Sequence, residues 1–419
     1  MSKPNSGQKK IFIIAGEDSG DLLGGRLMAA LHQLAPPTVR FQFIGIGGET
    51  MTAQGLKSLF PMKELSHFGF FAILPHLPKL IRRLRETVQR IKLEKPDLVI
   101  TIDAPAFCLR VSSRLSGTKI PRIHYVAPQH WAWLPKRANS LRHETDKILS
   151  LLPFEPEFFA GYGVDCQFVG HPVIESAAAK QNRDTAIDFR RQYKIPATAP
   201  LLMVLPGSRT SEFIRHMPIF AESVRLLFAK VSDLRVVLAV TEQHLDDRHH
   251  HSILEGLKND YSERLTIISA ASSPDESDRF AGFAAADAAL AVSGTVTLEL
   301  ALTQTPSVVA YRLDRMSWWL AQRLITVPLV ALSNIVAKQE IMPELLQDQA
   351  SAQNIVANLL PLLRHQAAYH QQKTALAEVA RNLMADNQVP SLIAASRVLD
   401  HLGIGADSAV QQRDFEISR

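Results

Sequence analysis

The feature that most constrains this fold is a regular alternation of short apolar runs with helical patterns. Each apolar run is followed by a turn and then by helical periodicity, which is typical of βα units around a parallel sheet. Continuous apolar strands of this kind are buried on both faces of the sheet. We predict strands at residues 11–15, 41–46, 98–102, 122–126, 148–152, 167–169, 201–205, 236–240, 265–268, 288–292 and 307–310.

The alternation starts afresh after Gly170-His171-Pro172, with a helical stretch at 184–193. A chain of 419 residues is long enough for two domains. We therefore predict an α/β protein of two Rossmann-like doubly wound domains facing a central cleft, at residues 1–172 and 173–365. C-terminal helices at 366–402 are expected to pack back on the first domain, and the polar residues 403–419 are expected to be disordered.

Composition excludes several classes of protein. The formal net charge of +5 comes from scattered Lys and Arg, which favours anionic partners but is too mild to indicate nucleic acid. Cys108 and Cys166 form no CxxC pair, so a disulfide framework and a cysteine zinc site are both unsupported, and a reducing cytoplasm fits best. We expect neither a signal peptide nor a membrane span, because no apolar stretch has the required form.

Acidic residues follow two strands of the first half. In parallel α/β sheets ligands bind beyond the carboxyl ends of the strands. The strand at 11–15 runs into Gly16-Glu17-Asp18-Ser19-Gly20-Asp21, and the strand at 98–102 ends at Asp103. Helix capping by Ser19 or Asp21 and turn formation by Asp103 are the plain alternatives. A carboxylate at a strand tip is also a suitable general base for a sugar hydroxyl.

The second half carries two turns that suit a phosphorylated ligand. Gly207 and Ser208 follow a strand and let backbone N–H groups face phosphate, while Arg209 can bind it bidentately and Glu212 opens the next helix. Another strand runs into Ser293-Gly294-Thr295, whose amides would begin a helix that carries Glu299. Small residues are common in βα turns, but two such turns in one half favour diphosphate binding, with Glu299 accepting from ribose hydroxyls.

Two apolar groups suggest contact with a lipid or sugar. Tyr125, Trp131 and Trp133 lie behind a strand, where they could pack against sugars or acyl chains or simply fill the core. A second group precedes a run of arginines, and such a pattern seats a helix in a membrane interface or buries it against the sheet. The membrane-contact residues that we predict are Phe70, Phe71, Ile73, Leu74, Leu77 and Leu80.

Metal and dehydrogenase chemistry find little support in the motifs. No Asp-x-Asp pair is present to bridge a metal to diphosphate, and the acid and histidine residues at 246–251 are typical of a solvated helix face. Neither half has a G-x-G-x-x-G after its first strand. We therefore expect no metal and no cofactor.

The motifs form an ordered set that resembles the lipid-A-disaccharide synthase family. The resemblance extends from about residue 11 to 402 and is carried by the acidic turn at 16–21 and by six further segments. These are Ile102-Asp103-Ala104-Pro105, His124-Tyr125-Val126, Trp131-Ala132-Trp133, Gly170-His171-Pro172, Leu205-Pro206-Gly207-Ser208-Arg209 and Ser293-Gly294-Thr295.

The resemblance implies a B-type glycosyltransferase fold and an inverting, metal-independent transfer. The donor would be UDP-diacylglucosamine and the acceptor diacylglucosamine 1-phosphate, joined by a β-1,6 bond with release of UDP. The enzyme would act peripherally on the inner face of the cytoplasmic membrane. Asp103 would be the catalytic carboxylate, with Glu17, Ser19 and Asp21 on the acceptor side. Asn334 would join the second-half residues on the nucleotide side. The oligomeric state is left open, and exchange of the C-terminal helices between protomers would give a homo-oligomer.

Three positions depart from the family pattern. Ser333 replaces a proline before Asn334, Gln339 replaces an arginine, and Gln322 replaces a frequent lysine. Gln339 cannot supply the charge that an arginine gives a phosphate. One alternative is another UDP-sugar transferase or epimerase of the same fold. The departures at Ser333 and Gln339 add a second, a binder of sugar nucleotides or lipids without catalysis.

Overall fold

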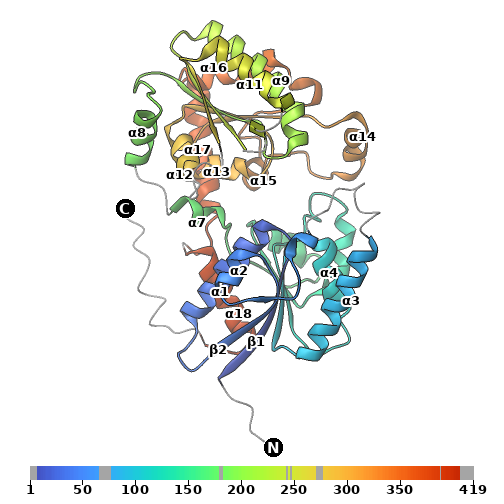
Figure 1. The fold of residues 1–419 in the computed structure, drawn as a ribbon. Coiled ribbons are helices and arrows are strands. Elements are labelled where there is room, and N and C mark those ends of the chain that lie inside the picture. Colours follow the sequence, from blue (N-terminus) through green and yellow to red (C-terminus); the bar gives the residue numbers. More distant parts are fainter. Residues whose placement is uncertain are drawn as a thin grey trace, which may run out of the picture. The chain divides into compact units, whose positions relative to one another are not determined.

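The computed structural model describes residues 7–65, 77–178, 183–241, 244–245, 248–269, 277–386 and 388–405. The chain forms two compact units (Figure 1), of which the first comprises Met1–Pro172 with Leu383–Arg419 and the second Val173–Asn382. The division after Pro172 falls where the sequence pattern restarts.

The first unit is built on a seven-stranded parallel sheet. Strand order reverses between β1 (Gln8–Ala15) and β4 (Leu98–Ile102), which pair with Ala15 opposite Ile102. Such a reversal leaves a crevice between the two strand ends. The full order is β3 (Lys57–Ser58), β2 (Arg40–Ile46), β1, β4, β5 (Arg122–Tyr125), β6 (Lys147–Ser150) and β7 (Cys166–Phe168).

Helices follow the strands of the first unit and bury the apolar sheet. All five residues of β4 and the last five of β1 are buried, as continuous apolar strands require. The helices described are α1 (Asp18–Leu34), α2 (Glu49–Ala53), α3 (Leu77–Glu94), α4 (Pro105–Ser113), α5 (Ala138–Glu144), α6 (Glu155–Ala160) and α18 (Pro390–His401).

The second unit repeats this plan with a six-stranded parallel sheet. Strand order reverses between β8 (Leu201–Leu205) and β11 (Ala288–Ala291), with Leu205 opposite Ala291. The order is β10 (Leu265–Ser269), β9 (Arg235–Val240), β8, β11, β12 (Ser307–Tyr311) and β13 (Glu344–Leu346). Its helices are α7 (Val173–Ala178), α8 (Arg183–Gln192), α9 (Thr210–Lys230), α11 (Arg248–Tyr261), α12 (Ser277–Ala285), α13 (Val296–Leu302), α14 (Arg315–Leu324), α15 (Leu332–Ala337), α16 (Ala352–Leu363) and α17 (Ala367–Asn382).

The two sheets confirm the predicted fold class of two parallel α/β domains, and all eleven predicted strands are present within a few residues. The additional strands β3 and β13 are edge strands of two and three residues. Runs this short carry too few residues to show a period, and their positions depend on the strands that they pair with.

The C-terminal helices do not behave as one group, which corrects the prediction for 366–402. α17 stays with the second unit and lies against α13 and α15. Its Gln372 accepts from the backbone N–H of Ser307 and donates to Ile341 O at 3.0 Å, so a buried polar link fixes it there. Only the segment from Leu383 returns to the first unit.

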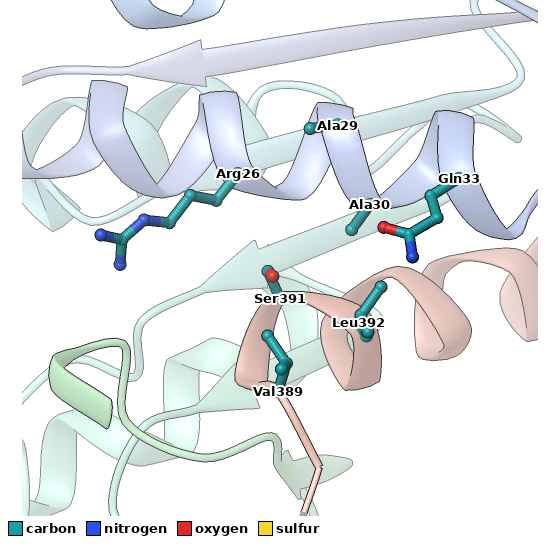
Figure 2. A pocket seen from close by; sticks show the side chains of 7 residues that line it. All are labelled: Arg26, Ala29, Ala30, Gln33, Val389, Ser391 and Leu392. Atoms are coloured by element: carbon teal, nitrogen blue, oxygen red, sulfur yellow. The ribbon is translucent and has the colours of Figure 1, made fainter. Parts of the chain in front are cut away.

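Helix α18 packs against α1 in the first unit. Val398 and Leu399 are fully buried in the core that surrounds β1 and β4. A hollow of about 320 Å³ remains between the two helices, lined by four α1 residues and by Val389, Ser391 and Leu392 (Figure 2). The α1 residues are Arg26, Ala29, Ala30 and Gln33, which belong to its later turns rather than to the end that follows β1.

The described helices include none that is long and apolar enough to cross a membrane. Residues 406–419 of the predicted tail lie outside the described part of the chain, as do Phe70, Phe71, Ile73 and Leu74 of the predicted membrane-contact group.

Candidate functional site

The acidic turn after β1 and the Asp103 turn after β4 meet at the carboxyl edge of the first sheet. A Cβ atom on Gly16 would lie 2.5 Å from the Cβ of Ala104, so only glycine fits here. The backbone N–H of Asp103 donates to Tyr125 O at 2.9 Å, which ties the same turn to the neighbouring strand β5. The glycine and the register of β1 with β4 therefore bring both predicted acidic turns to one place.

Asp103 is held in a strained backbone conformation. Its φ is 49° and that of Ala104 is 42°, so two successive residues with side chains occupy the left-handed region. Such residues cost free energy and cluster at functional sites. The carboxyl group is partly buried, and burial raises its pKa above the ordinary value, against a smaller lowering by the Ala104 backbone N–H. A carboxylate that is poorly solvated and rigidly placed is suited to accept a proton.

Glu17 and Asp21 follow the same strand but differ in what they contact. Glu17 and Ser19 are exposed at the start of α1. Asp21 is 5% exposed, and its carboxylate accepts from the backbone N–H groups of Gly48 at 2.7 Å, Thr50 at 2.8 Å and Met51 at 3.1 Å. Asp21 therefore caps α2, and the prediction that it lines the acceptor site is corrected: three backbone donors already occupy its oxygens.

The aromatic residues behind β5 are mostly part of the core, which corrects the prediction of acceptor contact for two of them. Tyr125 is 1% exposed and Trp131 is 7% exposed. The Trp131 indole N–H donates to Glu155 at 2.9 Å, while burial raises the pKa of this glutamate to about 7. Trp133 is half-buried and remains the one of the three with a partly accessible ring.

The described part of the predicted membrane-contact group lies at the start of α3. Leu77 is exposed and Leu80 is half-buried against the core. Arg82 and Arg85 are exposed, whereas Arg83 is held by Glu64, with Nε to carboxylate oxygen at 2.7 Å. This ion pair lowers the pKa of Glu64 to about 2. The start of α3 therefore presents exposed cations beside apolar side chains.

The two phosphate-type turns of the second unit also lie side by side. They follow β8 and β11, whose last residues pair directly. Gly207 has a φ of 103°, and a Cβ there would lie 2.7 Å from Glu212 Oε2 and 3.3 Å from Val292 Cγ2. Glycine is therefore needed both for the backbone conformation and for the close packing of the two turns. The Ser293 hydroxyl donates to Val330 O at 2.8 Å, which anchors the second turn.

Arg209 and Glu299 present different chemistry at this edge. The Arg209 side chain is 81% exposed at the N-terminal end of the long helix α9, and its Nη1 lies 3.4 Å from Glu212 Oε1. An exposed guanidinium beside a helix N-terminus can bind an anion such as diphosphate. Glu299 is 8% exposed and accepts from Arg279 at 2.9 Å. This ion pair fixes the glutamate on α13, immediately after the Ser293–Thr295 turn.

Asn334 is part of a buried hydrogen-bonded network, which corrects the prediction that it contacts the nucleotide. The side chain is fully buried. Its amide donates to Met342 O at 2.8 Å and to Glu344 Oε1 at 2.7 Å, and its oxygen accepts from the N–H groups of Ile341 and Met342, both at 2.9 Å. These four bonds fill the capacity of the amide. Asn334 therefore shapes the loop rather than offering a group to a ligand.

Glu344 is the site-supporting residue that sequence reasoning missed. Its carboxylate accepts from the N–H groups of Val330 and Ala331, both at 2.9 Å, as well as from Asn334. Burial raises its pKa above the ordinary value despite these donors. Since Val330 O accepts from Ser293, Glu344 is one step from the phosphate-type turn. An isolated glutamate in the short strand β13 gives no sequence signal for this role.

The departures at Ser333 and Gln339 lie on either side of this network. Ser333 is fully buried, and its hydroxyl donates to Thr297 O at 2.7 Å, so it links α15 to α13 where a proline could not. Lys338 and Gln339 are exposed. The loop is thus fixed by hydrogen bonds in place of the missing proline.

Within the described residues no three His, Cys, Asp or Glu side chains are grouped so as to hold a metal ion. The side chains at 246–251, which we predict to form a solvated helix face, lie outside the described part of the structure.

This chain is similar to known proteins over most of its length. A family model described as lipid-A-disaccharide synthetase matches residues 11–394. The lipid-A-disaccharide synthase of Rhodospirillum centenum is 42% identical over 392 residues, which cover 93% of this chain and 94% of that protein.

Solved structures share the fold at low identity. The UDP co-structure of MnaA from S. aureus has a TM-score of 0.62 at 16% identity, covering 94% of this chain and 96% of that one. The calicheamicin glycosyltransferase CalG4 has a TM-score of 0.60 at 15% identity, covering 94% and 98%. Likeness at this level shows that this chain shares the fold of these two proteins.

Replacing Asn334 tests whether it shapes the loop. Asn334→Ala removes four hydrogen bonds from a largely buried network, so we expect the free energy of unfolding to fall by more than about 2 kcal/mol. Chemical denaturation of the full chain measures this loss. Asn358→Ala is the matched control, because this amide donates within α16 to Asn354 O, and its effect should stay within about 0.5 kcal/mol. Unchanged stability with loss of UDP binding would instead make Asn334 a direct ligand contact.

Proposed function

The chain belongs to the lipid-A-disaccharide synthase family, and we propose how its two carboxyl edges carry out that reaction. The family identified from the sequence motifs is confirmed by the match of the family model and by the close relative. The reaction joins UDP-2,3-diacylglucosamine to 2,3-diacylglucosamine 1-phosphate through a β-1,6 bond and releases UDP. The chain is accordingly a glycosyltransferase of lipid A biosynthesis.

Asp103 is the residue that we assign as the general base. The acceptor's 6-hydroxyl gives its proton to the Asp103 carboxylate while its oxygen forms a bond to the anomeric carbon of the donor. The bond from that carbon to the diphosphate oxygen breaks, and the anomeric centre inverts. The observation that supports this role is the strained Asp103–Ala104 turn, which presents a poorly solvated carboxyl group at the switch point of the first sheet.

Glu17 is the second carboxylate that we place on the acceptor side. It is exposed on the turn after β1, which the contact between Gly16 and Ala104 holds against the Asp103 turn. An exposed carboxylate can accept hydrogen bonds from sugar hydroxyls and so orient the acceptor.

The second unit supplies the groups that bind and stabilise departing UDP. Arg209 is exposed beside the Gly207–Ser208 turn, and the Ser293–Thr295 turn emerges next to it. A guanidinium and backbone N–H groups neutralise charge that develops on the leaving diphosphate. Glu299, fixed by Arg279, is placed to accept from ribose hydroxyls. We propose that these protein groups stabilise the leaving diphosphate without a metal ion.

The site of action that we propose is the inner face of the cytoplasmic membrane. Both substrates carry acyl chains, and the start of α3 offers exposed Leu77 beside exposed arginines. Apolar side chains next to cations suit the boundary between acyl chains and anionic headgroups.

A UDP-sugar epimerase of the same fold is the alternative from the sequence. The fold shared with the UDP co-structure of MnaA does not separate an epimerase from a transferase, because enzymes of either class act on sugar nucleotides. Family membership favours transfer. An epimerase would turn over its sugar nucleotide without a lipid acceptor, so dependence of UDP release on the acceptor separates the two.

Release of UDP from the two lipid substrates, measured with EDTA present, tests the assignment of Asp103. We expect the wild type to release UDP only when both substrates are present. Asp103→Asn should lower kcat by about a hundredfold or more, since positioned general bases contribute about 10²–10⁴-fold. Asp97→Asn, directly before the amino end of the same strand β4, is the control and should retain activity. Equal rates in the wild type and Asp103→Asn would remove Asp103 as the base, and loss of release with EDTA would contradict metal independence.

The pH dependence of kcat/KM reports on the same carboxyl group. The base acts when deprotonated, so the rate should rise with pH and level off once Asp103 is ionised. Because burial raises the Asp103 pKa, the midpoint of this acid limb should lie above the ordinary value of 3.8. The residual activity of Asp103→Asn should lack the limb, and an identical limb in that variant would assign it to another group.

A further inference from the structure

Helix α14 of the second unit has an exposed apolar face that the proposed chemistry does not use. None of its ten residues is buried, although the helix is well formed and capped by Asp314, which accepts from Ser317 N at 2.9 Å. Met316 is 79% exposed, Trp319 58% and Leu320 42%. Figure 1 shows α14 at the outer edge of its unit.

The exposed side chains of α14 share one side of the helix. Met316, Trp319 and Leu320 are spaced three and four residues apart, which places them on neighbouring turns of the same face. Four of the eleven large apolar side chains that are exposed in the described part of the chain lie between positions 316 and 325, the fourth being Ile325 at 40%. The other seven are scattered over several elements. A cluster of this kind marks a surface for interaction.

The charged side chains within the helix itself are all positive. Arg323 lies one further turn along the same side, and its guanidinium is 3.5 Å from the centre of the Trp319 ring. Arg315 is also exposed, and the helix itself carries no Asp or Glu. Two copies of this face brought together would set like charges against each other. Apolar and aromatic side chains among arginines instead complement the anionic headgroups and acyl boundary of a bilayer.

The segment that leads into α14 is hydrogen-bonded to α9, the helix that follows the Gly207–Ser208 turn. Arg215 on α9 donates to Arg312 O at 3.3 Å and lies 3.8 Å from the Asp314 carboxylate. Helix α9 begins directly after Arg209, and α14 follows β12, which is adjacent to β11 in the sheet. The exposed face is therefore connected within one unit to the edge that we assign to the donor.

We propose that α14 is a second membrane-contact surface, which seats the donor-binding unit on an anionic phospholipid bilayer. It is separate from the predicted contact at the start of α3, which belongs to the other unit. In its link to the donor it rests on the proposed function, because an acylated donor enters from a bilayer. The contact itself needs neither substrate nor turnover.

Vesicle binding by the full chain tests this surface directly. The triple variant Met316→Ser, Trp319→Ser and Leu320→Ser changes only exposed side chains. It should bind vesicles of phosphatidylglycerol and phosphatidylethanolamine about tenfold more weakly than the wild type, since three apolar side chains lose their transfer from water. Ile187→Ser, at a 56% exposed position on α8, is the matched control and should bind like the wild type. Arg315→Gln with Arg323→Gln should reduce the preference for these vesicles over phosphatidylcholine.

Trp319 also reports its own insertion. Phospholipids brominated on their acyl chains should quench the wild-type tryptophan emission, and Trp319→Phe should remove most of that quenching. Equal vesicle binding by the triple variant and the wild type, or equal quenching in Trp319→Phe, would overturn the proposal. A change in oligomeric mass of the triple variant without vesicles would overturn it in favour of a second copy.

Activity in detergent micelles separates this inference from the proposed function. The triple variant should release UDP there at the wild-type rate, because the micelle delivers both substrates without a bilayer. If the wild type released no UDP in micelles, the proposed function would fail while the vesicle result still decided the role of α14.

Discussion

The reversal of strand order at the centre of each sheet is the constraint on which the two candidate sites depend. Chain connections run outward in opposite directions from β1 and β4, and again from β8 and β11. Because βα crossovers are right-handed, the helices that follow these central strands cover opposite faces of the sheet. The turns between strand and helix are thereby left uncovered at one edge, where ligands bind in folds of this type. Each functional residue that we assign in this protein, except those on α3 and α14, lies on or directly behind one of these turns.

Tight backbone packing gives each edge its shape. In the first unit the absence of a side chain on Gly16 allows Ala104 to lie close to it. The backbone of Asp103 and Ala104 has a positive φ at this point. In the second unit Gly207 lies between Glu212 and Val292 and so joins the two turns. Polar networks behind the edges complete the arrangement: Asp21 caps α2, and Glu344 with Asn334 holds the segment that accepts from Ser293. Buried networks whose members are all satisfied fix one geometry, which a transferase needs in order to position its substrates.

The sequence predicts the sheets and the turns well because both depend on local patterns. Continuous apolar runs locate the buried strands, and small or acidic residues directly after them locate the turns. The partners of individual polar side chains do not follow from such patterns. By its position in the sequence Asp21 resembles a ligand-binding acid, whereas in the structure the backbone N–H groups of Gly48 and Thr50 donate to its carboxylate. Tyr125 and Asn334 are likewise buried. No sequence pattern indicates the role of Glu344, because that role depends on a loop that the fold brings to it.

The central claim is that the edge formed by the turns after β8 and β11 binds the UDP moiety of the donor. A crystal structure of the full chain with UDP tests it most directly. We expect the diphosphate to lie against the backbone N–H groups of Gly207–Ser208 and Ser293–Thr295 and within reach of Arg209, with the ribose near Glu299. UDP bound elsewhere, with both of these turns unoccupied, would contradict it.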